Sequence, residues 1–145
     1  MKVDTKASGL IDVDERQKIT FPQGLFGFES LNDYVLLDAE QEPFYWLQSV
    51  DKKQTAFVLI DPALFRPDYE INFQSDDLAD LGIESADNAL VFAIVTIFEN
   101  EPITANLQGP LVINRETKIG RQAILNDQRW RTKHDIMAEL AGSRK

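Results

Sequence analysis

Two pairs of carboxylates are the first candidates for chemistry in this sequence. Asp76 and Asp77 are adjacent, and Glu99 and Glu101 are separated by one residue. Paired carboxyl groups act as general acid and general base only where a pocket raises the pKa of one of them. The first pair stands at the start of a short predicted helix and the second in a predicted hairpin turn. We therefore expect both pairs to be solvated, and they give no basis for predicting an enzyme.

Histidine, metal-binding and phosphate-binding patterns are equally sparse. No neighbouring Ser or Asp offers a triad-like arrangement to the single histidine, His134, which we expect at the surface. Asp12, Asp14 and Glu15 are similar to the start of a calcium loop, but the required glycine and the final glutamate are missing. The Gly24–Gly27 segment lacks the Lys-Ser/Thr of a phosphate loop. We predict no catalytic residue, no metal site and no cofactor.

The segment Arg129, Trp130 and Arg131 is the one candidate for nucleic-acid binding. An aromatic ring between two guanidinium groups can stack on a base and hold phosphates. Against this, the formal net charge is −9 and the isoelectric point is about 4.5, so the field of the whole chain repels a phosphate backbone. We expect no direct nucleic-acid binding, and an RNA-binding module that uses this basic C-terminal segment is the alternative function.

The negative charge is distributed unevenly along the chain. No Lys or Arg occurs between Pro67 and Asn114. The acidic residues of this stretch include Asp68, Glu70, Asp76, Asp77 and Asp80. Such a surface steers basic partners toward it, although an acidic surface can also serve solubility alone.

Size and composition favour one domain. The chain has 145 residues, of which 43% are hydrophobic, so it can bury a single core. It has no cysteine, which excludes disulfides and thiolate zinc sites. The sequence shows neither a secretory signal pattern nor an apolar run near the ~20 residues of a membrane span. We expect a cytoplasmic protein that does not enter a membrane.

Short segments with β-branched and aromatic residues recur between turns. In the segment 10–14, Ile11 and Val13 fall on one face of a predicted strand and Asp12 and Asp14 on the other. Apolar segments over 35–37, 44–47 and 56–60 predict successive antiparallel strands. The run Ala89–Phe98 is apolar on both faces, which predicts a strand at the centre of the sheet.

Turn residues and short helices complete the predicted fold. Gly109 and Pro110 predict the end of a strand over 103–107, and a hairpin is expected over 111–125. Ser75 or Asp76 is expected to cap a short helix over 77–81, with Leu78 and Leu81 facing inward and Gly82 ending it. A second short helix is expected over 135–141. The predicted fold class is mostly β, a single compact domain with one or two short helices.

The segment ITFPQGLFGFE, residues 19–29, joins a strand end to two glycine turns, where glycine can adopt left-handed backbone conformations. It is followed along the chain by Leu47-Gln48-Ser49, Asp61-Pro62, Val95-Thr96 and Val112-Ile113-Asn114. In this order, over roughly residues 3 to 131, these segments resemble the FliW family of flagellar assembly factors. Trp130 stands where many members have tyrosine, and the chain after residue 131 lies outside the pattern.

The resemblance implies an antiparallel β-barrel-like domain over residues 1–131, followed by a tail or short helix over 132–145. It implies two protein partners, flagellin and CsrA, the small RNA-binding regulator that represses flagellin translation. Free flagellin would occupy the factor, and export of flagellin would free the factor to antagonise CsrA, away from the RNA-binding surface of CsrA. Flagellin translation would thereby be coupled to flagellin export without any enzymatic step.

Eight residues are candidates for contacts with these partners. We hypothesise that the CsrA-facing surface consists of the acidic residues that flank the predicted helix over 77–81, namely Asp68, Glu70, Asp76, Asp77 and Asp80. Phe28, Phe65 and Tyr69 are candidates for flagellin binding because they are bulky and close to turns, although such residues can equally belong to the core.

Overall fold

Antiparallel strands make up most of the regular structure in the computed structural model, which describes residues 1–143. The strands are β1 Lys2–Thr5, β2 Gly9–Asp12, β3 Lys18–Thr20, β4 Asp33–Asp38, β5 Tyr45–Ser49, β6 Ala56–Ile60, β7 Ala89–Thr96, β8 Thr104–Asn114, β9 Gly120–Gln122 and β10 His134–Asp135. Four 3-10 turns, η1 Glu15–Gln17, η2 Pro62–Leu64, η3 Ala79–Leu81 and η4 Ala86–Asn88, and the helix α1 Ile136–Ser143 complete the elements. None of the described helices is long and apolar enough to cross a membrane.

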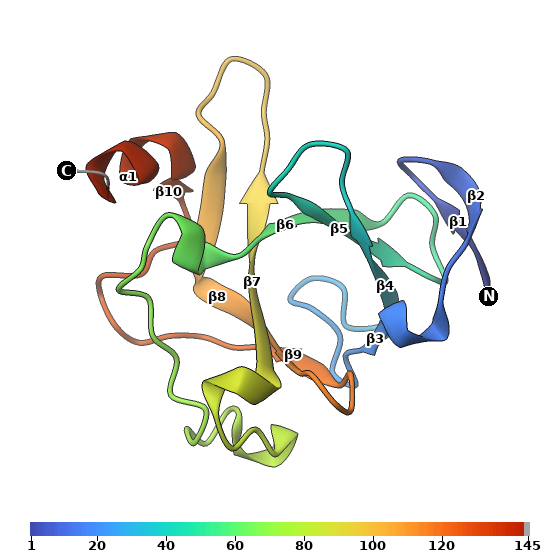
Figure 1. Cartoon of the computed structure of the whole chain (residues 1–145), viewed down its shortest axis with the longest axis horizontal. Coiled ribbons are helices and arrows are strands. Elements are labelled where there is room, and N and C mark those ends of the chain that lie inside the picture. The colour runs from blue at the N-terminus through green and yellow to red at the C-terminus, as the bar shows by residue number, and fades with distance from the viewer. Residues whose placement is uncertain (144–145) are drawn as a thin grey trace.

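One antiparallel sheet wraps almost into a closed barrel (Figure 1). Its strand order is β10-β8-β7-β6-β5-β4-β3, and β9 pairs with the second half of β8. The Thr20 N–H donates to the carbonyl oxygen of Lys118 at 3.0 Å, which brings β3 beside the start of β9. The β1–β2 hairpin packs separately on the outside. The predicted mostly-β, barrel-like fold is therefore confirmed.

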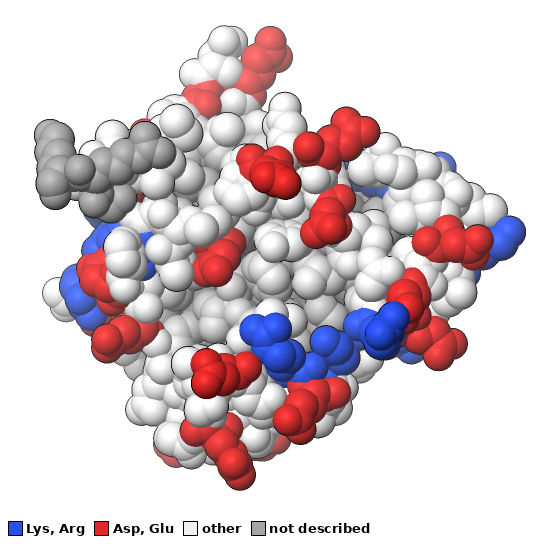
Figure 2. All heavy atoms as spheres, viewed as in Figure 1, with Lys and Arg blue, Asp and Glu red and all other residues white. Residues whose placement is uncertain are grey.

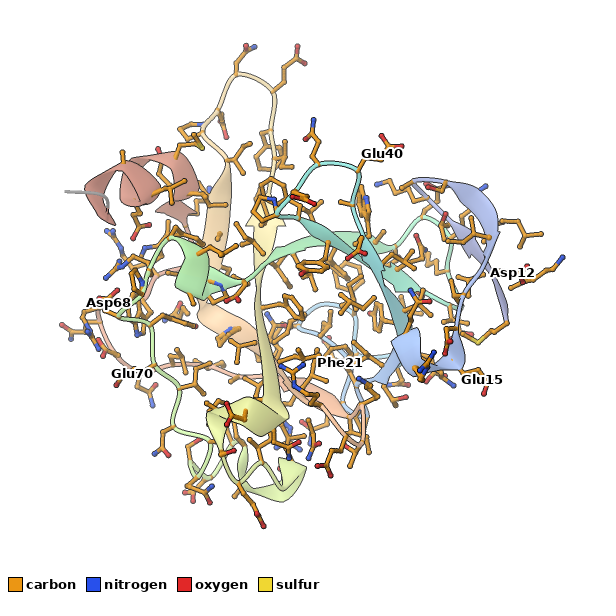
Figure 3. The ribbon with its side chains drawn as sticks, viewed as in Figure 1. Asp12, Glu15, Phe21, Glu40, Asp68 and Glu70 are labelled. Atoms are coloured by element: carbon orange, nitrogen blue, oxygen red, sulfur yellow. The ribbon has the colours of Figure 1, made fainter. Side chains whose placement is uncertain are left out.

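Large apolar side chains fill the inside of this sheet. Phe21 lies in the interior, where its ring meets the edge of Tyr34 at a centroid distance of 5.6 Å (Figure 3). Ile19 and Leu25, from the same ITFPQGLFGFE segment, are also fully buried. Gly24 has a φ of 67°, and a Cβ there would lie 2.5 Å from the Cα of Glu29, so this close turn requires glycine. The segment thus closes the barrel core.

The run Ala89–Phe98 only partly follows its predicted course. It forms β7 at the centre of the sheet, but the strand ends at Thr96. Ile97 and Phe98 continue into the β7–β8 hairpin and are exposed, because this hairpin projects beyond the neighbouring strands (Figure 1). The prediction that the whole run avoids water was therefore wrong at its last two residues.

Gly109 and Pro110 do not end a strand, contrary to prediction. β8 continues through both residues, and the register shifts there, since Phe92 faces Leu111 whereas Ile94 faces Asn106. The Gly109 N–H donates to the side chain of Asn106, and Pro110 has no N–H to satisfy, so a bulge forms without leaving a donor unpaired.

The predicted helix over 77–81 shrinks to the turn η3. Within residues 1–143 no side chain caps this turn, but Leu78 and Leu81 are buried and Gly82, with a φ of 70°, ends it as expected. The second predicted helix is α1, in whose first turn the Ala138 N–H donates a hydrogen bond to the Asp135 carboxylate at 3.0 Å.

Residues 132–143 do not trail away from the sheet. β10 pairs with β8, and Ile136 is buried in the core.

Candidate functional site

The acidic residues predicted to face a partner all lie on the connection between β6 and β7, residues 61–88, and all are exposed. Asp68 and Glu70 follow η2. Asp76 and Asp77 precede η3, and Asp80 lies within it. Figure 3 shows Asp68 and Glu70 on the outer side of this connection, with Asp12 and Glu15 on the opposite side of the molecule. The structure therefore brings the five residues onto one connection, in two groups.

Asp68 belongs to a network of arginines. Its carboxylate lies 2.8 Å from the Arg66 guanidinium and 3.9 Å from that of Arg129. The hydrogen bonds from Arg66 lower the pKa of Asp68 below its usual value. Arg66 also reaches Glu139 on α1 at 2.6 Å. Asp68 thus helps to hold the C-terminal helix, and little of its charge is left for a partner.

Asp80 is also paired. Both of its carboxylate oxygens accept hydrogen bonds from Arg121 of β9, at 2.7 and 2.6 Å, and these bonds lower the pKa of Asp80. Arg121 donates to the carbonyl oxygen of Asp77 as well. This bidentate contact fastens the η3 turn to the sheet.

Glu70, Asp76 and Asp77 keep their charge free. Within residues 1–143, none of these three side chains forms an ion pair. Asp76 and Asp77 border a shallow depression of about 440 Å³, which the exposed apolar side chain of Ile124 also lines. Two free carboxylates beside an exposed apolar group form a chemically mixed surface of the kind that protein partners bind.

The aromatic candidates have different environments. Phe28 is 38% exposed and packs edge-to-face on Phe57, at a centroid distance of 5.0 Å. Tyr69 is half-buried and its hydroxyl donates to the carbonyl oxygen of Leu107 at 2.6 Å; burial raises its pKa. Phe65 is only 1% exposed, so its proposed role as a surface contact was wrong. Since η2 turns the Phe65 ring under the sheet, it belongs to the core.

Comparison with known proteins assigns the family. The family model described as FliW protein matches residues 2–136. The chain belongs to the FliW family. The flagellar assembly factor FliW of Treponema denticola is 51% identical over 141 residues, which cover 97% of this chain and 96% of that relative. The flagellar assembly factor FliW of Treponema pallidum is 46% identical over 145 residues, covering 99% of this chain and 97% of the relative.

A solved structure agrees with this membership of the FliW family. The crystal structure of the flagellar assembly factor FliW aligns with a TM-score of 0.84 at 38% sequence identity, and covers 94% of this chain and 96% of that chain. The family resemblance predicted from the sequence is therefore confirmed.

In this FliW chain, Trp130 is unavailable for stacking on a nucleic-acid base. Its side chain is buried, with the guanidinium of Arg66 4.5 Å and that of Arg129 4.9 Å from the ring centroid. Tyr69 meets the ring edge-on at 4.7 Å. The ring that suggested RNA binding is therefore part of the packing beneath the C-terminal segment.

His134 is buried, so the prediction of a surface histidine was wrong. The Arg131 N–H donates to its Nε2 at 2.8 Å, and Nδ1 lies 2.9 and 3.0 Å from the two carboxylate oxygens of Glu139. Pairing of β10 with β8 turns this side chain inward. Among the described residues, no group of three or more His, Cys, Asp or Glu side chains is arranged to hold a metal ion.

Sequence reasoning missed the exposed apolar residues. Ile97, Phe98 and Ile124 are all more than half exposed, at 56%, 59% and 52%. For Ile97 and Phe98 the available signal was the acidic turn that follows Phe98. A turn at the end of a long apolar run indicates a hairpin that extends beyond the neighbouring strands.

Proposed function

We propose that this chain is a non-enzymatic flagellar assembly factor of the cytoplasm that switches between two protein partners. One partner is flagellin. The other is CsrA, which the factor antagonises away from its RNA-binding surface, so that export of flagellin relieves repression of flagellin translation. The factor works without a cofactor and without contacting RNA itself.

Family membership carries this proposal. Relatives named flagellar assembly factor FliW match at 51% and 46% identity over almost the whole of both chains. A partner switch needs no catalytic group, only two binding reactions that draw on one limited pool of the factor.

The distribution of free charge supports a basic partner. Glu70, Asp76 and Asp77 are exposed and carry negative charge that no arginine neutralises within residues 1–143. The positive potential of an RNA-binding protein extends beyond its RNA-binding surface, so such carboxylates attract and orient it even where the contact is made elsewhere. These three residues, rather than Asp68 and Asp80, are the core of the proposed CsrA-facing surface.

Titration calorimetry with the CsrA and flagellin of the same organism tests the switch. We expect the purified chain to bind each protein, and flagellin to displace CsrA from the preformed complex. A chain that binds neither protein, or that holds both at once with unchanged affinity, would contradict the proposal. Retention of flagellin mRNA by the isolated chain would favour the RNA-binding alternative.

Matched charge variants test the surface. The variant Glu70→Gln/Asp76→Asn/Asp77→Asn should weaken CsrA binding about tenfold at low salt, since each exposed ion pair contributes up to ~1 kcal/mol. The control variant Asp12→Asn/Glu15→Gln/Asp51→Asn changes the net charge equally at other exposed carboxylates and should leave the affinity nearly unchanged. Equal losses of CsrA affinity in both variants would mean that the effect depends on net charge and not on these three carboxylates.

A further inference from the structure

A second surface, which shares no lining residue with the depression beside Asp76 and Asp77, combines an apolar floor with an acidic rim. Three turns or hairpin ends surround a hollow of about 350 Å³, namely the β1–β2 turn, the β4–β5 turn and the end of the β7–β8 hairpin. Its apolar lining comes from Phe44, Trp46, Val58, Ile97 and Ile103. This volume is at the lower end of the ~300–1,000 Å³ range of binding pockets, so it accepts a few side chains rather than a folded surface.

The apolar wall of this hollow extends into solvent. Ile97 is 56% exposed, and its neighbour Phe98 is 59% exposed at the same hairpin end. The ring of Trp46 and the side chain of Val58 come from paired strands, since Trp46 and Val58 face each other across β5 and β6. A rigid apolar floor beside exposed apolar side chains is typical of an interaction site.

The strands of the floor leave no edge for an added strand. β5 pairs with β4 and β6, and β6 pairs with β5 and β7, so their backbone groups are already engaged. Recognition in the hollow must therefore use side chains. An amphipathic helix that lays its apolar face into a groove binds through its side chains and needs no free strand edge.

Carboxylates border the hollow. Asp38 and Glu40 line it on the β4–β5 turn, where Figure 3 labels Glu40, and Glu99 and Glu101 stand exposed on the β7–β8 hairpin. Figure 2 shows acidic side chains on this hairpin at the top of the view and on the turn below it. No Lys or Arg is among the described residues that line the hollow. Cationic side chains beside the apolar face of a ligand would complement this rim.

We propose that the hollow between the β1–β2 turn, the β4–β5 turn and the β7–β8 hairpin binds an amphipathic helix of a partner protein whose apolar face is bordered by Lys or Arg. This inference rests on the proposed function only for the identity of the natural partner. The chemistry of the site follows from its apolar floor and acidic rim.

A synthetic helix tests the site directly. The probe is a peptide of about 18 residues, five turns at 3.6 residues per turn, with leucines on one face and lysines elsewhere. One control peptide carries glutamate in place of lysine, and another has the Leu/Lys composition in scrambled order. We expect saturable binding of the Leu/Lys helix alone, measured by fluorescence anisotropy. Equal binding of either control peptide, or no binding of the Leu/Lys helix, would overturn the proposal.

Matched isoleucine variants locate the bound helix. Ile97→Gln should weaken binding about tenfold, the equivalent of ~1.4 kcal/mol, whereas Ile124→Gln, a similarly exposed isoleucine at 52%, should have no effect. Unchanged affinity in Ile97→Gln, or a loss confined to Ile124→Gln, would place the helix elsewhere. A dimer in sedimentation that Ile97→Gln abolishes would assign the hollow to a second copy of this chain.

The rim and the natural partner are tested separately. Asp38→Asn/Glu40→Gln should weaken binding of the Leu/Lys helix more than Asp12→Asn/Glu15→Gln does. If CsrA and flagellin bind the chain but the peptide does not, the helix site is overturned and the partner switch stands. If the peptide binds as expected but neither protein does, the hollow stands and the proposed partners are overturned.

Discussion

Two segments of the molecule carry many charged residues but use some of them differently. In the C-terminal segment, residues 127–143, the carboxylate of Glu139 is engaged by contacts within the molecule, because it is shared between the His134 ring and Arg66. In the β6–β7 connection, Asp68 and Asp80 are paired, while Asp76 and Asp77 have no cationic partner within residues 1–143. Glu139 therefore serves contacts within the molecule, whereas the carboxylates of Asp76 and Asp77 leave their charge on the surface.

Burial accounts for the difference. The side chain of Glu139 is 21% exposed, whereas that of Asp80 is 64% exposed even though it is paired. A charge that leaves water must be paired and hydrogen-bonded, but an exposed carboxylate can remain free at little cost. Glu139 therefore serves packing, and the carboxylates of Asp76 and Asp77 are available to a partner.

Removal of Trp130 gives the largest expected effect and tests the structural role of the C-terminal segment. Trp130→Ala deletes a buried ring that contacts Tyr69 and the guanidinium groups of Arg66 and Arg129, so it should lower the free energy of unfolding by about 3–5 kcal/mol. Met137→Ala, at an exposed position on α1, is the control and should change it by less than ~0.5 kcal/mol. Denaturant unfolding measures both. If Trp130→Ala lowers the free energy of unfolding no more than Met137→Ala does, the Trp130 ring does not stabilise the C-terminal segment.

Local sequence features predicted elements that depend on their own residues. The strand over Ala56–Ile60 and the left-handed Gly82 follow from a short apolar run and from glycine chemistry, so they were predictable. The continuous strand through Gly109 and Pro110 was not, because a side chain from Asn106 and a register shift against β7 accommodate the turn residues. Glycine and proline therefore predict the end of an element reliably only where no distant group accommodates them within it.

The candidate site was predictable only in part for the same reason. The base-free stretch after Pro67 located the acidic connection, but two of its five selected carboxylates are paired with Arg66 and Arg121. Arg121 lies 41 positions from Asp80, and no pattern of local charge reveals such a contact. His134 likewise turned out buried because β10 pairs with β8, a contact between segments about 30 residues apart.

Acidification tests the contribution of the Asp68 ion pair. The expected effect on the free energy of unfolding is smaller than that of Trp130→Ala. The pKa of Asp68 is lowered in the folded state, so its contribution is present above its unfolded value of about 3.9 and is lost as the pH falls through the folded value. Asp68→Asn should therefore lower the free energy of unfolding at pH 7 by less than ~1 kcal/mol, and this difference from the wild type should vanish in acid. Asp76→Asn, at an exposed carboxylate with no ion-pair partner within residues 1–143, is the control and should change the free energy of unfolding at pH 7 by less than ~0.5 kcal/mol. Urea unfolding across this pH range measures both variants.

The smallest effect on stability is expected where the effect on binding is largest. Glu70→Gln/Asp76→Asn/Asp77→Asn removes three exposed charges that have no ion-pair partner within residues 1–143, so the free energy of unfolding should change by less than ~0.5 kcal/mol. A small increase is the favoured direction, because the chain is acidic and loses like-charge repulsion. Thermal unfolding of this variant beside the Asp12→Asn/Glu15→Gln/Asp51→Asn control measures the change. A loss of several kcal/mol in the free energy of unfolding would show that these carboxylates hold the connection in place. They would then serve packing, as Glu139 does, and would not be available to a partner.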